Sequence, residues 1–335
     1  MGSPLSSGAA EESPSFVTRV APFCLDRTEV TLRAYRACQA SGACSAASRA
    51  GRFCNERLGG REEHPVNCVT WHQAAAYCEH VGRRLPAETE WEFAGRGGER
   101  GLEYPWGNEP PDGRTCWKHV GGTCAVGEYP AGAFDLLDLG GNVWEWTADW
   151  FGAYPWEPTD GHARSYRGGS WSRRFEKWMR PRLRNRSAPD DFGSHLGFRC
   201  ALTLPGVECP YGPRDGGRGC ARGVETADCP AGQRWNGARC ARPGEPRCAA
   251  GRIERPGRGC VLERVADGPA PGAAGEPIAW VRAPAHDADC AAHQPGRPHG
   301  YHATGGTHQA RNAAGAARGC KNRDVGVGWN STCCP

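Results

Sequence analysis

The stretch that decides the fold is Asp138-Leu-Gly-Gly-Asn-Val-Trp-Glu-Trp146. Its tryptophans alternate with polar and glycine positions, so one side of the stretch is suited to burial. Asp138, Asn142 and Glu145 offer side-chain oxygens close together in sequence. Carboxylates, freed backbone carbonyls and adjacent glycines are typical of a turn wrapped on a hard cation. The alternative is a strand that enters a hydrophobic core and carries incidental acidic residues.

The composition favours a loop-rich protein. The chain has 335 residues, which suggests about two domains. Its 48 glycines and 27 prolines favour turns over long helices, and 39% hydrophobic residues support one good core but not a uniformly globular chain. Because the net charge is only +4, the composition gives no reason to expect nucleic acid as a partner.

The cysteines indicate the compartment. A chain with 19 cysteines is expected to form a disulfide framework in an oxidising environment, so we expect an exported protein that is periplasmic, cell-surface or secreted. The odd number leaves at least one cysteine unpaired or in an intermolecular bond. Residues 1–15 lack the apolar segment of a signal peptide and are expected to be a disordered leader. No apolar run is long enough to span a membrane.

The first strands and loop are indicated by composition. Residues 16–30 are rich in β-branched and aromatic side chains, which predicts a strand pair near the domain edge. A short helix is expected over residues 31–38. The segment that follows, to residue 68, is expected to be a long loop pinned by disulfides of Cys38, Cys44, Cys54 and Cys68.

Two further helices have clear boundary signals. Thr70 can cap a helix that ends at Gly82, because Gln73 holds the capping-box position. Pro86 is suited to the first position of a second helix, which should run to Gly95. A turn-rich insertion then follows, and a disulfide between Cys116 and Cys124 could close it.

Six sequence blocks, taken in order, resemble the formylglycine-generating enzyme family, also called the sulfatase-modifying factor domain. The resemblance covers residues 16–203 and implies an α+β, elaborated C-type-lectin-like fold with much irregular structure. The blocks are Pro65-Val-Asn-Cys-Val-Thr-Trp71, Gly82-Arg-Arg-Leu-Pro-Ala-Glu-Thr-Glu-Trp-Glu-Phe-Ala94, Tyr104-Pro-Trp-Gly-Asn108, Gly140-Gly-Asn-Val-Trp-Glu-Trp146, Arg167-Gly-Gly-Ser-Trp171 and Leu196-Gly-Phe-Arg-Cys200.

The resemblance implies one calcium site and one disulfide. The side chains of Asp138 and Glu145 and the carbonyls of Gly141 and Val143 match the ligands of a structural calcium in the family. A hydrogen-bond network without metal is the alternative. A second family calcium site has no matching ligands between Cys116 and Cys124. The family's disulfide between separate elements maps to Cys78 and Cys200.

The resemblance does not extend to the family's catalytic cysteines. Members that oxidise a sulfatase cysteine hold copper through two cysteines shortly after the Arg-Gly-Gly-Ser block. Those positions here are Arg173 and Trp178, so we do not expect copper or the oxidase activity. Relatives that use non-haem iron carry a His-x3-His-x-Glu set on a separate helical domain, which this chain lacks. We therefore lean towards a protein that is not an enzyme.

The reaction pocket of the family is partly matched. Trp144, Ser170, Arg186 and His195 correspond to residues that line it or lie near bound substrate. Alternate arginines from 180 to 186 would share one face of a strand and could hold a carboxylate, sulfate or phosphate, together with Arg173 and Arg174. We favour the alternative, in which several of these arginines form ion pairs within the fold, with Asp149, Glu176, Asp190 and Asp191.

Beyond the domain the chain contains small cysteine-rich units. Residues 204–260 hold three short repeats, each expected to be closed by its own disulfide. Zinc is the weaker alternative, because Cys-x2-Cys pairs are absent there. Residues 261–277 are expected to be a linker and 278–335 a small cysteine-containing module, in which His299, His302 and His308 could bind a transition metal or be ordinary loop residues. The expected disulfides are Cys209–Cys220, Cys229–Cys240 and Cys248–Cys260.

The functional expectation follows from the retained blocks and the replaced cysteines. We expect a binding or scaffold module for a peptide, a glycan or another anionic ligand, with a protein partner on the cysteine-rich C-terminal region. The alternative is a divergent enzyme that uses the retained pocket for different chemistry or needs a partner.

Overall fold

The computed structural model describes residues 1–6, 10–214, 219–236 and 239–243, and the backbone of four strands beyond them. These strands are β11 (Arg252–Arg255), β12 (Gly259–Leu262), β13 (Asn322–Val325) and β14 (Trp329–Cys334). The Cys248–Cys260 pair, the linker after residue 262 and the three C-terminal histidines lie outside what is described.

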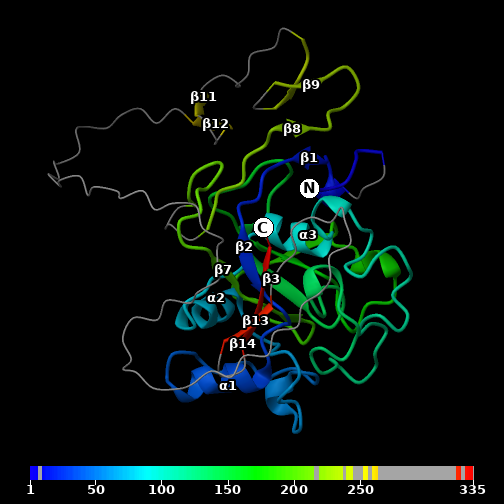
Figure 1. Ribbon diagram of the computed structural model, residues 1–335, viewed down its shortest axis with the longest axis vertical. Helices are drawn as coiled ribbons and strands as arrows, with labels where there is room; N and C mark the ends of the chain where they lie inside the picture. Colours follow the sequence, from blue (N-terminus) through cyan, green and yellow to red (C-terminus); the bar gives the residue numbers. More distant parts are fainter. Residues whose placement is uncertain are drawn as a thin grey trace, which may run out of the picture.

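Two four-stranded sheets form the centre of the molecule (Figure 1). One has the order β5-β4-β3-β6, in which only the β3–β6 pair is parallel. The other has the order β13-β14-β2-β7 and is antiparallel. The strands of the first sheet are β3 (Trp144–Trp150), β4 (Arg164–Arg167), β5 (Arg184–Ser187) and β6 (Leu196–Gly197), and those that begin the second are β2 (Phe23–Asp26) and β7 (Ala201–Thr203).

The predicted strand pair over residues 16–30 is wrong in its pairing. Strand β1 (Phe16–Val17) pairs with β8 (Thr226–Ala227), and β2 pairs with β7 and β14. The partners come from distant parts of the chain, so local composition could indicate the strands but not their neighbours. The C-terminal strand β14 likewise pairs with β2 of the central sheet, while most of the predicted module over residues 278–335 lies outside the described residues.

Three helices flank the sheets: α1 (Leu32–Ala40), α2 (Trp71–His80) and α3 (Glu88–Gly95). Helix α2 begins as predicted, because Thr70 and Gln73 form the reciprocal capping box. Helix α3 begins two residues after Pro86, and the Glu90 side chain accepts a hydrogen bond from the Ala87 backbone N–H at 2.8 Å. Short 3-10 turns lie at Ala10–Glu12, Asn55–Arg57, Gly98–Arg100, Ala133–Asp135 and Glu176–Met179.

The main core lies between α1, α2 and the β3 sheet. Trp144 and Trp146 are fully buried there, together with Tyr35, Tyr77 and Phe198. The disulfide Cys78–Cys200, implied by the resemblance, joins α2 to the residue before β7. Short helices, small sheets and long irregular connections confirm the α+β class. Within the parts of the chain that are described, no helix is long and apolar enough to cross a membrane.

The first residues are packed, so the expectation of a disordered leader is wrong for the described part of residues 1–15. Ser3 and Glu12 are each 1% exposed. The Gly2 backbone N–H donates to the buried Glu92 carboxylate at 2.7 Å, and the Met1 amino group donates to the Phe16 carbonyl at 2.9 Å. The sequence suggested disorder because this segment lacks an apolar run, but hydrogen bonds hold it against the domain.

The first cysteine repeat is docked on the domain. It is closed by Cys209–Cys220, and the next by Cys229–Cys240, as the sequence predicts. Arg214 of the first repeat pairs with the buried Asp149 carboxylate at 2.7 Å. This repeat is therefore joined to the domain by a buried ion pair. Strands β9 (Arg234–Trp235) and β10 (Cys240–Ala241) form the hairpin of the second repeat. Figure 1 shows β9 further from the central sheets than the first repeat.

Candidate functional site

The turn from Asp138 to Asn142 has an unusual backbone. Asp138 has φ 57° and Asn142 has φ 49°, which is the left-handed region that aspartate and asparagine tolerate better than most residues. Asn142 Oδ1 accepts a hydrogen bond from the Cys124 N–H at 3.0 Å. The Asn142 oxygen therefore holds the neighbouring loop in place, and Asn142 is not among the calcium ligands that the resemblance implies.

Glu145 is fully buried and is held by Arg199. Arg199 Nε donates to Glu145 Oε2 at 2.7 Å, and Nη2 donates to Oε1 at 2.8 Å. The Trp91 indole also donates to Oε2 at 2.7 Å. The guanidinium is itself fixed by the backbone carbonyls of Asp26, Arg27 and Leu137. This bidentate pair orients Glu145 towards the turn.

Two further carboxyl groups lie in the same buried cluster. Asp138 Oδ2 accepts a hydrogen bond from the Gly127 N–H at 2.6 Å, whereas its buried Oδ1 has no hydrogen-bond partner among the described residues. Burial raises the pKa of Asp138 to about 6. Burial, and next the Asp138 charge, raise the pKa of Glu29 well above its usual range. Three carboxyl groups thus share one guanidinium, and burial favours the protonated forms of Glu29 and Asp138 when no further cation is present.

The donor set fits a calcium ion. Asp138 Oδ1 is a buried oxygen without a partner, and Glu145 Oε1 keeps acceptor capacity beside Arg199 because each carboxylate oxygen has two lone pairs. The carbonyl-bearing residues Gly141 and Val143 lie between them in sequence. The expected ligands are therefore compatible with an oxygen-coordinated cation, and calcium at this turn stays a prediction.

The four predicted pocket residues are only partly brought together. Trp144 and Ser170 are fully buried, and the backbone N–H of Trp144 donates to the backbone carbonyl of His195 at 2.8 Å. Burial, and then the Arg173 charge, lower the pKa of His195. Arg186 is exposed and stacks on the Phe151 ring at 4.5 Å. Trp144 and Ser170 are thus closed off from solvent, so a ligand could contact only the more exposed residues around them.

Arg173 and Trp178 lie against Trp144. The Arg173 guanidinium stands 4.8 Å from the Trp178 ring and 5.7 Å from the Trp144 ring. The two indoles meet edge to face at 6.0 Å. Arg173 has no ion pair within the described segments, and its buried Nε has no hydrogen-bond partner there. The Arg173 cation is therefore held by two aromatic rings.

A cavity of about 470 Å³ opens next to Arg173, lined by Lys118, Arg174, Phe175, Glu176 and Lys177. Three of these five side chains are cationic and one is anionic. The Lys118 ammonium sits 3.6 Å from the Trp117 ring, and Lys177 lies 5.8 Å from Trp178. The sequence analysis missed Lys118, because only the folded chain brings residue 118 next to residue 173. The backbone N–H of Lys118 donates to the backbone carbonyl of Arg173 at 3.1 Å.

The arginine stripe beside this cavity is mostly structural, as the favoured interpretation states. Arg184 is buried and pairs with Glu88 at 2.7 Å, and Arg182 pairs with Glu103 at 2.9 Å. Arg180 pairs with Glu12 at 3.4 Å. The acidic partners differ from the predicted ones. They are Glu88 of α3, Glu12 of the N-terminal turn and Glu103 of the loop after Gly101.

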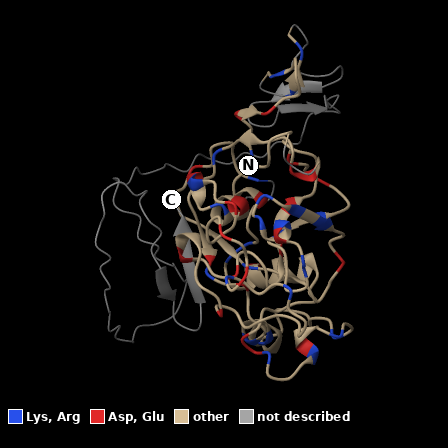
Figure 2. Cartoon of the chain, turned by 90° about the vertical axis from the view of Figure 1, so that its right-hand side faces the viewer, with Lys and Arg blue, Asp and Glu red and all other residues tan. Residues whose placement is uncertain are grey.

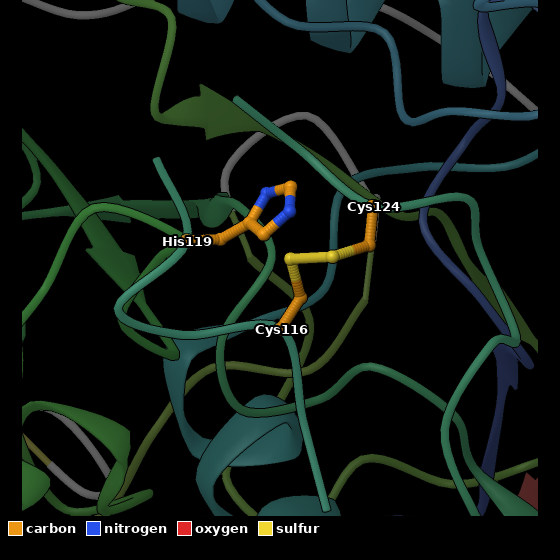
Figure 3. Close-up of side chains that lie close together, drawn as sticks. All are labelled: Cys116, His119 and Cys124. Atoms are coloured by element: carbon orange, nitrogen blue, oxygen red, sulfur yellow. A yellow bond between two sulfur atoms is a disulfide. The ribbon is translucent and has the colours of Figure 1, made fainter. Parts of the chain in front are cut away.

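The loop that carries Lys118 is closed by the disulfide Cys116–Cys124 (Figure 3). His119 places a ring nitrogen within 4.8 Å of both sulfur atoms. Its Nδ1 lies 2.8 Å from the Gly122 carbonyl, and its backbone N–H donates to the Trp171 carbonyl at 2.8 Å. With both sulfurs in a disulfide, the three side chains offer no thiolate to a metal. The disulfide and these hydrogen bonds fix Lys118 beside the cavity.

Glu29 and Arg199 also belong to the buried cluster of the candidate site, and the sequence analysis missed them. Glu29 lies within residues 16–30, which were predicted to form a strand pair, and Arg199 lies in the Leu-Gly-Phe-Arg-Cys block, so both were visible as charged residues in apolar surroundings. Their contact with the turn at Asp138 depends on pairing between distant segments. Sequence spacing carries no signal for such contacts.

Comparisons with known proteins match the domain. The family model described as sulfatase-modifying factor enzyme 1-like domain matches residues 1–204. The formylglycine-generating enzyme of Mus musculus is 38% identical over 166 residues, covering 42% of this chain and 45% of that protein. The formylglycine-generating enzyme of Streptomyces coelicolor is 40% identical over 168 residues, covering 42% of this chain and 54% of that protein.

Another mouse relative bears the name inactive C-alpha-formylglycine-generating enzyme 2. It is 40% identical over 158 residues, covering 42% of this chain and 49% of that protein. The chain thus spans about half the length of these curated relatives. The structure of PvdO from Pseudomonas aeruginosa is similar with a TM-score of 0.51 and 25% identity, covering 61% of this chain and 90% of that one. The elaborated C-type-lectin-like fold is confirmed.

Proposed function

The chain belongs to the sulfatase-modifying factor enzyme 1-like family, and we propose that it is an exported, non-oxidising member that acts as a binding or scaffold module. The observation that carries the proposal is the pair Arg173 and Trp178 at the positions that match the family's catalytic cysteines. A guanidinium and an indole cannot replace two thiolates as ligands of copper.

The state of the remaining cysteines supports the same conclusion. Every cysteine whose side chain is described is in a disulfide, so this part of the chain offers no free thiolate pair. So many disulfides also support a place outside the reducing cytoplasm. The mouse relative named inactive indicates that family membership does not by itself require the activity.

The first test is a turnover assay. The full chain, supplied with copper and a Cys-x-Pro-x-Arg peptide, should form no aldehyde above the rate measured without protein, because the soft ligands for copper are missing. The Streptomyces coelicolor enzyme is the positive control under identical conditions. Aldehyde formation by this chain, detected by peptide mass spectrometry, would overturn the proposal.

Calcium at the Asp138 turn is the second part of the proposal. The buried, unpartnered Asp138 Oδ1 supports it. With Ca²⁺ at 100 times its dissociation constant, the free energy of unfolding should rise by about 2.7 kcal/mol. The variant Asp138→Ala should lose this increase and the calorimetric heat of Ca²⁺ binding.

The control for calcium is Asp160→Ala, which removes an exposed carboxylate elsewhere on the surface. It should keep both the binding heat and the stabilisation. If wild type takes up no Ca²⁺, or if the two variants lose it equally, calcium does not occupy this turn.

A further inference from the structure

We propose that the cavity lined by Lys118, Arg174, Phe175, Glu176 and Lys177 binds a sulfate or phosphate ester through its tetrahedral oxyanion. This inference rests on the proposed binding function and names the class of ligand for it. We call this group of five residues, together with Arg173, the cationic cavity.

The positive charge of the cationic cavity is not balanced by the cavity's own acidic side chains. Three of the five lining side chains, Lys118, Arg174 and Lys177, are cationic, and one, Glu176, is a carboxylate. Arg173 adds a fourth cation beside them, because its backbone carbonyl accepts from the Lys118 backbone N–H. No ion pair joins any of these five charged side chains to another residue in the segments that the structure describes. Blue and red segments are otherwise intermixed through the body of the molecule (Figure 2). An anionic ligand would supply the missing partner.

Aromatic rings, and not carboxylates, hold three of these four cations in place. Lys118 lies on Trp117, while Arg173 and Lys177 both lie near Trp178. A ring face attracts a cation but carries no net charge, so the cations keep their positive potential. The contrast is with Arg184, Arg199 and Arg214, each of which pairs with a buried carboxylate.

The cavity also has an unused hydrogen-bond donor beside it and a rigid wall. Arg173 Nε, next to the lining residue Arg174 in sequence, is buried without a hydrogen-bond partner among described residues. The Cys116–Cys124 disulfide fixes the loop that carries Lys118, so less entropy is lost when a ligand binds. Oxyanions of sulfate and phosphate esters accept several charge-assisted hydrogen bonds at once, which suits a guanidinium beside ammonium groups.

The size and one apolar wall indicate an ester with an organic group. A volume of about 470 Å³ is within the range of small-molecule sites and exceeds what a bare oxyanion fills. Phe175 is 68% exposed and lines the same cavity. An aryl group on the ester could stack on this ring while the oxyanion meets the cations.

The test is calorimetric titration of the full chain with 4-nitrophenyl phosphate, 4-nitrophenyl sulfate and the neutral analogue 4-nitroanisole. We expect one or both esters to bind, and the tighter one to identify the oxyanion. The neutral analogue should not bind measurably. Raising NaCl from about 50 mM to about 500 mM should weaken the binding, because the contacts are between charges at the surface.

The variant Arg174→Gln/Lys177→Gln should weaken ester binding by about tenfold, since two charge-assisted contacts are lost. Both side chains are exposed, so folding should be unaffected, and an unchanged thermal midpoint verifies this. The matched control is Arg49→Gln/Arg57→Gln, which removes the same charge from exposed positions elsewhere and should leave the affinity unchanged.

Three results would overturn the cationic cavity as an oxyanion site: no binding of either ester, equal binding of 4-nitroanisole, or equal weakening by the two double variants. These outcomes are separate from the turnover assay. Aldehyde formation there would refute the non-oxidising function and leave the oxyanion result intact.

Discussion

Replacing Cys78 and Cys200 with alanine should lower the free energy of unfolding by about 5 kcal/mol, because the bond closes a loop with a sequence separation of 122 residues. Without the bond, the unfolded chain regains the freedom that this long loop had lost. Cys78 and Cys200 lie in the main core and are each 0% exposed, so the loss of their sulfur atoms also costs packing. Denaturant titration of the wild type and the variant measures the difference.

The matched control replaces Cys38 and Cys44 with alanine. That disulfide spans a sequence separation of 6, so its loss should cost only about 2 kcal/mol in the same entropic model. Cys38 and Cys44 are also buried, at 3% and 8% exposure. If the two variants lose equal stability, loop closure does not explain the role of Cys78–Cys200.

The second large effect is expected for Arg199→Met, which should destabilise the fold by about 3–5 kcal/mol. The substitution removes the only cation that faces Glu145, Glu29 and Asp138 in the described part of the interior, and it leaves their carboxyl groups without a counter-charge. It also removes the donors to three backbone carbonyls. Chemical denaturation in the presence of a calcium chelator isolates this effect from metal binding.

A surface pair provides the control for Arg199. Arg33 pairs with Glu63, and their side chains are 66% and 60% exposed. The variant Arg33→Met should therefore change the stability by less than about 1 kcal/mol. A loss of similar size in both variants would mean that the buried pair is no more important than an exposed one.

Local sequence signals predicted where the helices begin to within two residues. The capping box at Thr70 and Gln73 placed the start of α2 correctly, because capping depends on neighbours in sequence. The same reasoning placed α3 two residues too early, since Pro86 lies outside the helix. The disulfides within the repeats were also predictable from spacing, because each closes a short unit without a core.

The candidate site was less predictable. Trp144 and Arg173 do lie together, but Lys118 joins them from a loop that the sequence analysis treated only as an insertion. The arginine stripe was expected to form ion pairs within the fold, and it does, but the sequence did not indicate that Arg184 pairs with Glu88 from α3. Whether a cation is free or paired depends on which distant acid packs against it, and composition does not contain that information.

The sequence by itself determined the family, the α+β class and the acidic turn from Asp138 to Glu145. These depend on residue identity and short spacing. Only the tertiary structure decided that Arg199 holds Glu145, that the first residues are packed and that β14 joins the central sheet. The reason is physical: each involves partners far apart in the chain, which come together only when the core has formed.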